Sequence, residues 1–66
     1  MYKLRQVRKA RGWSLTDVTV KTGIPESSLS ALERGLLPAH PGWRRRLSKA
    51  FQVSSEELFE EVKDED

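Results

Sequence analysis

The stretch from Ser14 to Gly35, SLTDVTVKTGIPESSLSALERG, predicts two short helices joined by a tight turn. Ser14 is a favourable N-cap, and Asp17 three residues later completes the spacing of a capping box. Gly23 can adopt the left-handed conformation that ends a helix, and Pro25 is accepted only at the start of the next one. Because the turn between these signals is so short, it predicts a fixed crossing of the two helices.

Apolar periodicity and capping residues predict three further helices. The first spans about residues 2–11, with Leu4 and Val7 facing inward. Another begins with Pro41 in its first turn, where the missing N–H has no cost. The last follows Ser54, another favourable N-cap. The sequence therefore predicts an all-α fold of five short helices.

Three segments resemble the phage-repressor type of helix-turn-helix protein, the lambda and 434 cI/Cro class. They are LRQVRKARGWS at 4–14, GIPESSLSALERG at 23–35 and LSKAFQVSSEELF at 47–59. All three fit the family pattern without insertion or deletion, so the resemblance covers nearly the whole chain. It implies a compact five-helix bundle over residues 1–59, in which residues 14–35 form the helix-turn-helix.

The resemblance also implies which side chains meet double-stranded DNA, because the second helix of this motif, here about residues 26–34, enters the major groove. The residues expected to face base edges are Glu26, Ser27, Ser30 and Ala31. Those expected beside the DNA backbone are Leu15, Thr16, Pro25, Ser28, Arg34, Arg44 and Arg45. The base-facing set holds no Arg, Gln or Asn, so direct readout is expected to be sparse.

The charge is divided unevenly along the chain. Up to Ser55, eleven Lys and Arg residues against three acids give +8, and from Glu56 onward seven acids against one Lys give −6. A basic body attracts phosphates through counterion release, and its affinity should fall steeply with salt. The acidic end, residues 60–66, is expected to fray.

Arg8 and Glu33 occupy positions at which members of the family commonly form a partly buried ion pair. A bidentate bond between them would hold their helices in one relative orientation. The alternative is two independent surface charges.

A single subunit of this fold contacts only a few base pairs, so the resemblance implies a homodimer on an inverted repeat. The dimer surface is expected around the last helix, at Phe51, Val53, Leu58, Phe59 and Val62.

Composition argues against other classes of protein. The chain has no cysteine and one histidine, so neither a thiolate metal site nor a nucleophilic catalytic constellation is expected. We expect no enzyme activity, no cofactor and no small-molecule substrate. No signal peptide and no apolar stretch of about 20 residues is present, which predicts a cytoplasmic protein with no membrane partner.

A second function stays open, namely a protein-interaction module or antitoxin-like protein that keeps the fold with weak base readout. Two features favour this function: the negatively charged Glu26 at the start of the helix expected to enter the major groove, and the acidic C-terminal end. The apolar loop Leu36-Leu37-Pro38-Ala39 either packs against the core or offers an exposed patch to a protein partner.

Overall fold

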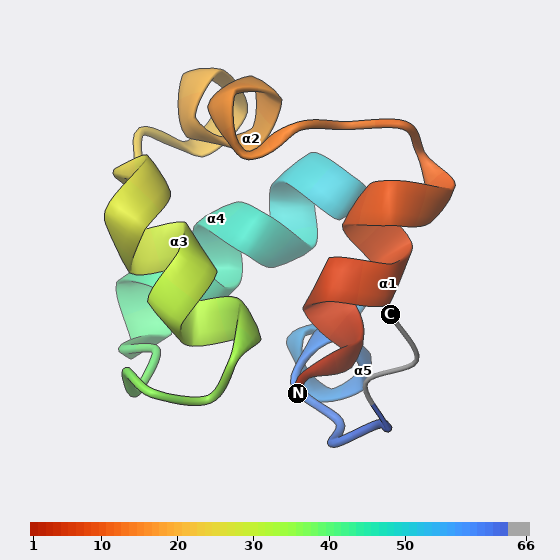
Figure 1. Ribbon diagram of the computed structural model, residues 1–66. Helices are drawn as coiled ribbons and strands as arrows, with labels where there is room; N and C mark the ends of the chain where they lie inside the picture. Colours follow the sequence, from red (N-terminus) through yellow and green to blue (C-terminus); the bar gives the residue numbers. More distant parts are fainter. Residues whose placement is uncertain (64–66) are drawn as a thin grey trace.

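Five helices follow one another in the computed structural model, which describes residues 1–63 (Figure 1). They are α1 (Lys3–Ala10), α2 (Leu15–Thr22), α3 (Glu26–Glu33), α4 (Pro41–Phe51) and α5 (Ser55–Leu58). α4 passes through the middle of the molecule, with α2 and α3 on one side and α1 and α5 on the other (Figure 1). This arrangement confirms the predicted all-α fold.

The helix ends lie where the capping residues predict them. At the start of α2, the Ser14 hydroxyl accepts a bond of 3.0 Å from the Asp17 N–H, and the Asp17 carboxylate accepts one of 2.8 Å from the Ser14 N–H. α4 begins with Pro41. His40, the residue before it, caps the helix, because its ring nitrogen accepts a hydrogen bond from the N–H of Trp43. These bonds satisfy N–H groups that have no partner inside the helix.

The core gathers apolar side chains from every helix and from the turn between α2 and α3. Its members, each with at most 1% of its surface exposed, are Leu4, Val18, Ile24, Leu29, Leu32, Leu47, Phe51 and Leu58. Trp13 lies at the edge of the core, where it is half-buried and packs against Phe51 with ring centroids 4.9 Å apart. Since Ile24 comes from the turn itself, the core anchors the turn as well as the two helices.

The expected dimer surface is partly wrong, because Phe51 and Leu58 are completely buried in this core. Phe51 ends α4 and Leu58 ends α5, and both side chains belong to the core cluster. Val53, Phe59 and Val62 are half-buried. Phe59 packs edge-on against the ring of Tyr2, with centroids 5.3 Å apart.

The beginning of the acidic end does not fray as expected. The Lys3 N–H donates to the Glu60 carbonyl and the Val62 N–H donates to the Met1 carbonyl, each at 2.8 Å. Tyr2 and Glu61 form an isolated antiparallel bridge between these bonds. The N-terminus therefore holds residues 60–62 in place. The rest of the expectation, for residues 64–66, lies outside the described part of the chain.

Candidate nucleic-acid interface

The turn between α2 and α3 is fixed by its own hydrogen bonds. The Thr22 hydroxyl donates to the Val18 carbonyl at 2.7 Å and accepts from the Ile24 N–H at 3.2 Å. Gly23 between them has φ of 77°, the left-handed conformation that favours glycine. Because Thr22 bonds to residues on both sides of it and Ile24 is buried, the turn fixes the orientation of α3 relative to α2.

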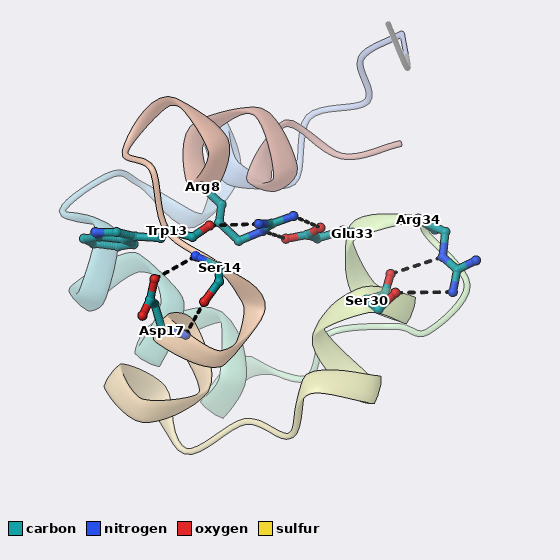
Figure 2. A network of polar contacts seen from close by, with 7 residues as sticks. All are labelled: Arg8, Trp13, Ser14, Asp17, Ser30, Glu33 and Arg34. Atoms are coloured by element: carbon teal, nitrogen blue, oxygen red, sulfur yellow. Dashed lines mark hydrogen bonds and ion pairs between the residues drawn. The ribbon is translucent and has the colours of Figure 1, made fainter. Parts of the chain in front are cut away.

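Arg8 joins three parts of the molecule (Figure 2). Its Nε and Nη2 donate to the two carboxylate oxygens of Glu33 at 2.6 and 3.1 Å, and its Nη1 donates to the Trp13 carbonyl at 2.8 Å. The two charged side chains are only 12% and 5% exposed. The expected ion pair is therefore present, and the alternative of independent surface charges is wrong. Through it, α1 fixes the end of α3 and the residue before the cap of α2.

The first turns of α2 and α3 meet at the exposed end of the motif. The Thr16 hydroxyl, in the first turn of α2, donates to the Glu26 carboxylate at 2.9 Å. Pro25, Glu26 and Ser27 are exposed in succession at the start of α3. The remaining expected contact residues of α3, Ser28, Ser30 and Ala31, are half-buried. The sequence prediction placed Thr16 and Glu26 at the interface but missed the bond between them.

A basic recess of about 250 Å³ lies between α1, the start of α2 and α3. It is lined by Met1, Arg5, Arg8, Leu15, Ser30, Glu33 and Arg34. Arg5 and Arg34 line this recess beside the Arg8–Glu33 ion pair, so three of its lining residues are arginines and one is an acid. On one wall the Arg34 Nη2 donates to the Ser30 hydroxyl at 3.3 Å (Figure 2). Arg5 escaped the sequence prediction because no local pattern brings it beside residues of α3.

The arginines of α4 point in different directions, as their succession along a helix predicts. Arg44 donates to the Ala39 carbonyl at 3.2 Å, and its guanidinium carbon lies 4.7 Å from the centre of the Phe59 ring. Arg46 instead reaches the Thr22 carbonyl beside the α2–α3 turn. Arg45 is exposed and, with Arg44 and Lys49, lines an open recess of about 460 Å³.

The loop after α3 was expected either to pack against the core or to be an exposed apolar patch, and different residues of it do each. Leu37 and Ala39 pack against the core, whereas Leu36 is 70% exposed. The loop is therefore anchored at two residues and leaves one apolar side chain open to solvent.

Residues 1–63 offer neither a metal site nor a membrane span. No cluster of three or more His, Cys, Asp or Glu side chains there is arranged to hold a metal ion. None of the helices in the same range is long and apolar enough to cross a membrane.

Comparison with known proteins agrees with this geometry. Residues 3–62 match a protein family described as a helix-turn-helix domain. The structure is similar to the N-terminal DNA binding domain of SinR from Bacillus subtilis, with a TM-score of 0.78 and 30% sequence identity over 94% of this chain and 91% of that one. Comparison with curated protein sequences gave no match. The match over most of the chain and the shared five-helix architecture show that the chain belongs to the helix-turn-helix family, of the phage-repressor type that its sequence resembles.

Proposed function

We propose that this protein is a sequence-specific DNA-binding transcriptional regulator. The observation that carries the proposal is the exposed end of the motif, where the first turns of α2 and α3 are held together by the Thr16–Glu26 bond. In proteins of this architecture the second helix of the motif enters the major groove. Its base-facing residues would be Glu26, Ser27, Ser30 and Ala31. The similarity to a DNA binding domain supports this assignment.

The charges around α3 support binding to the DNA backbone. The basic recess between α1 and α3 places Arg5 and Arg34 beside the start of α2. Phosphates are attracted both by such cations and by the free N–H groups of a helix N-terminus. We assign backbone contacts to the guanidinium groups of Arg34 and Arg5 and to the main-chain N–H of Thr16 in the first turn of α2, with Leu15, Pro25 and Ser28 flanking them. Arg45, and Arg44 in part, would add a more distant electrostatic contribution.

The proposed regulator acts as a homodimer on an inverted repeat. One α3 offers few base contacts, and a second half-site about 34 Å away along the duplex would double them. The burial of Phe51 and Leu58 limits the apolar part of the proposed dimer surface to Val53, Phe59 and Val62. A surface this small favours a weak dimer that is completed on DNA, where the linked half-sites raise the effective concentration.

Selection of duplexes from a random pool tests this function. Enrichment of a short inverted repeat supports a dimeric, sequence-specific regulator. Salt-sensitive binding without any enriched sequence would contradict sequence specificity and leave only a basic surface attracted to phosphate. No binding at low salt would contradict the proposal as a whole.

The exposed Leu36 favours a second function, the binding of a protein partner beside the motif. Leu36 is 70% exposed in a loop whose other apolar residues pack inward. An apolar contact of this kind would change little with salt, whereas a DNA interface would weaken strongly. Leu36→Ser would then abolish partner binding without changing the affinity for DNA.

A further inference from the structure

Thr16 and Glu26 connect the two helix ends that the proposed function places against DNA. They stand ten positions apart in the sequence, and the hydroxyl-to-carboxylate bond of 2.9 Å crosses the turn between α2 and α3. Both residues are exposed, so neither polar group needs this bond to offset a loss of contact with water. Its effect is to restrict where the carboxylate lies at the tip of α3.

We propose that Glu26, positioned by Thr16, specifies a cytosine in the DNA sequence that this protein recognises. The inference rests on the proposed function, since it requires α3 to enter the major groove. It adds to that function the identity of a base and the pair of residues that selects it.

The base that Glu26 selects follows from the fact that a carboxylate can accept hydrogen bonds but cannot donate them. An ionised carboxylate only accepts hydrogen bonds, so the single proton of the Thr16 hydroxyl is directed to Glu26 Oε2, and Oε1 stays available as a further acceptor. In the major groove guanine and thymine present acceptors at the positions such a group would reach. Adenine presents its amino group beside its own acceptor N7, whereas cytosine presents an amino donor and no acceptor of its own in the major groove. Cytosine is therefore the base that an acceptor-only side chain favours.

The other residues expected to face bases do not act solely as hydrogen-bond acceptors. The serine hydroxyls of Ser27 and Ser30 can both donate and accept, and the Ser30 hydroxyl already accepts from Arg34. Ala31 offers only a methyl group. Among these four positions, Glu26 is the one whose chemistry excludes particular bases.

The negative charge of Glu26 separates this role from a merely structural one. Close to phosphates, a carboxylate weakens binding to every sequence while it selects among them. Removing it should therefore raise the affinity for unrelated DNA and abolish the base preference. If Glu26 only stabilised α3, its removal would instead lower binding to all duplexes together.

The test uses four duplexes that differ at one base pair of the selected sequence, titrated with the full chain. The wild-type protein should prefer cytosine at one position of each half-site by roughly 10- to 100-fold. Glu26→Gln should move that preference to adenine, because an amide can bond to adenine N6 and N7 together. Glu26→Ala should lose the preference and bind a non-selected duplex at least as tightly as the wild type.

Two matched variants test the positioning role of Thr16. Thr16→Ser keeps the hydroxyl and should keep the preference for cytosine. Thr16→Val keeps the shape of the side chain without the hydroxyl and should reduce that preference several-fold. The ratio of affinities within one variant does not depend on how much of that protein is folded, because the same sample meets every duplex.

Several results would overturn the inference while leaving DNA binding intact. These are a wild-type protein without cytosine preference at any position, an unchanged preference in Glu26→Gln, and equal ratios for Thr16→Val and Thr16→Ser. Absence of binding to any duplex would instead overturn the proposed function and this inference with it.

Discussion

Arg8 of α1 and Glu33 of α3, which lie 25 positions apart in the sequence, form a bidentate ion pair with bonds of 2.6 and 3.1 Å. The same guanidinium donates to the carbonyl of Trp13, immediately before the N-cap of α2. One side chain thus fixes both helices of the motif relative to α1. The orientation of the proposed DNA-reading helix depends on this contact as well as on the turn at Gly23.

The first prediction concerns this ion pair. Glu33→Gln should lower the free energy of unfolding by about 3–5 kcal/mol, because it leaves the Arg8 charge buried without its counterion. For a domain of this size that corresponds to a fall in melting temperature of more than about 10 °C. Thermal unfolding followed by circular dichroism measures the change.

Glu57→Gln is the matched control for Glu33→Gln. It removes the same charge from the ion pair with Lys3, whose side chains are 33% and 47% exposed at a separation of 3.2 Å. An exposed pair contributes less than about 1 kcal/mol. Equal melting temperatures for the two variants would show that the Arg8–Glu33 pair stabilises the fold no more than an exposed ion pair does.

The second prediction follows from the capping box of α2. Hydrogen bonds from the backbone and then the side chain of Ser14 lower the pKa of Asp17 below its ordinary value of 3.8. A lowered pKa in the folded state contributes stability above the unfolded value, and this contribution is lost as the pH falls through the folded value. The difference in stability between the wild type and Asp17→Asn should therefore be constant above about pH 5 and shrink below pH 3.8. Urea unfolding across this pH range checks it, and a difference that grows toward acid would have the wrong sign.

The third prediction concerns the turn. Gly23→Ala should destabilise the protein by about 1–2 kcal/mol, since an L-residue is strained at φ of 77°. The cost is one of backbone conformation, because an added Cβ would meet only Arg46 Nη1 at 3.8 Å. Gly23→Asn should cost less, because asparagine tolerates the left-handed region. If Asn destabilises as much as Ala in urea unfolding, the strain argument does not hold.

The fourth prediction addresses the backbone contacts. Arg34→Ala should weaken binding to all duplexes alike and reduce the slope of log affinity against log salt by about one. Lys21→Ala removes the same charge at the far end of α2, where the ammonium lies 4.6 Å from the centre of the Trp13 ring. That variant should leave the slope nearly unchanged. Equal slopes for both variants would show that Arg34 contacts no phosphate.

Local signals predicted most of the fold. Ser14 and Ser54 cap helices because their side chains bond to N–H groups three residues ahead, and such bonds follow from the sequence. The family resemblance also implied the Arg8–Glu33 pair. The docking of residues 60–62 on the N-terminus was missed, since backbone bonds between the two ends of a chain leave no pattern in either segment.

The candidate site was predicted less completely than the fold. Periodicity placed Leu58 in the apolar part of a helix, but it could not say whether that face closes the core or meets a second subunit. The Thr16–Glu26 bond depends on how two helices cross, and the contribution of Arg5 depends on how α1 lies beside α3. Both require the three-dimensional arrangement.

The proposed function requires that α3 recognises a DNA sequence while positively charged side chains around it bind the phosphates. Fluorescence anisotropy with the selected duplex and a shuffled duplex of equal composition tests it most directly, at about 50 and about 200 mM salt. We expect tighter binding to the selected duplex at both salt concentrations, and a fall of orders of magnitude in the affinity for both duplexes between the lower and the higher salt concentration. Equal affinity for the two duplexes, or no binding at the lower salt concentration, would contradict it.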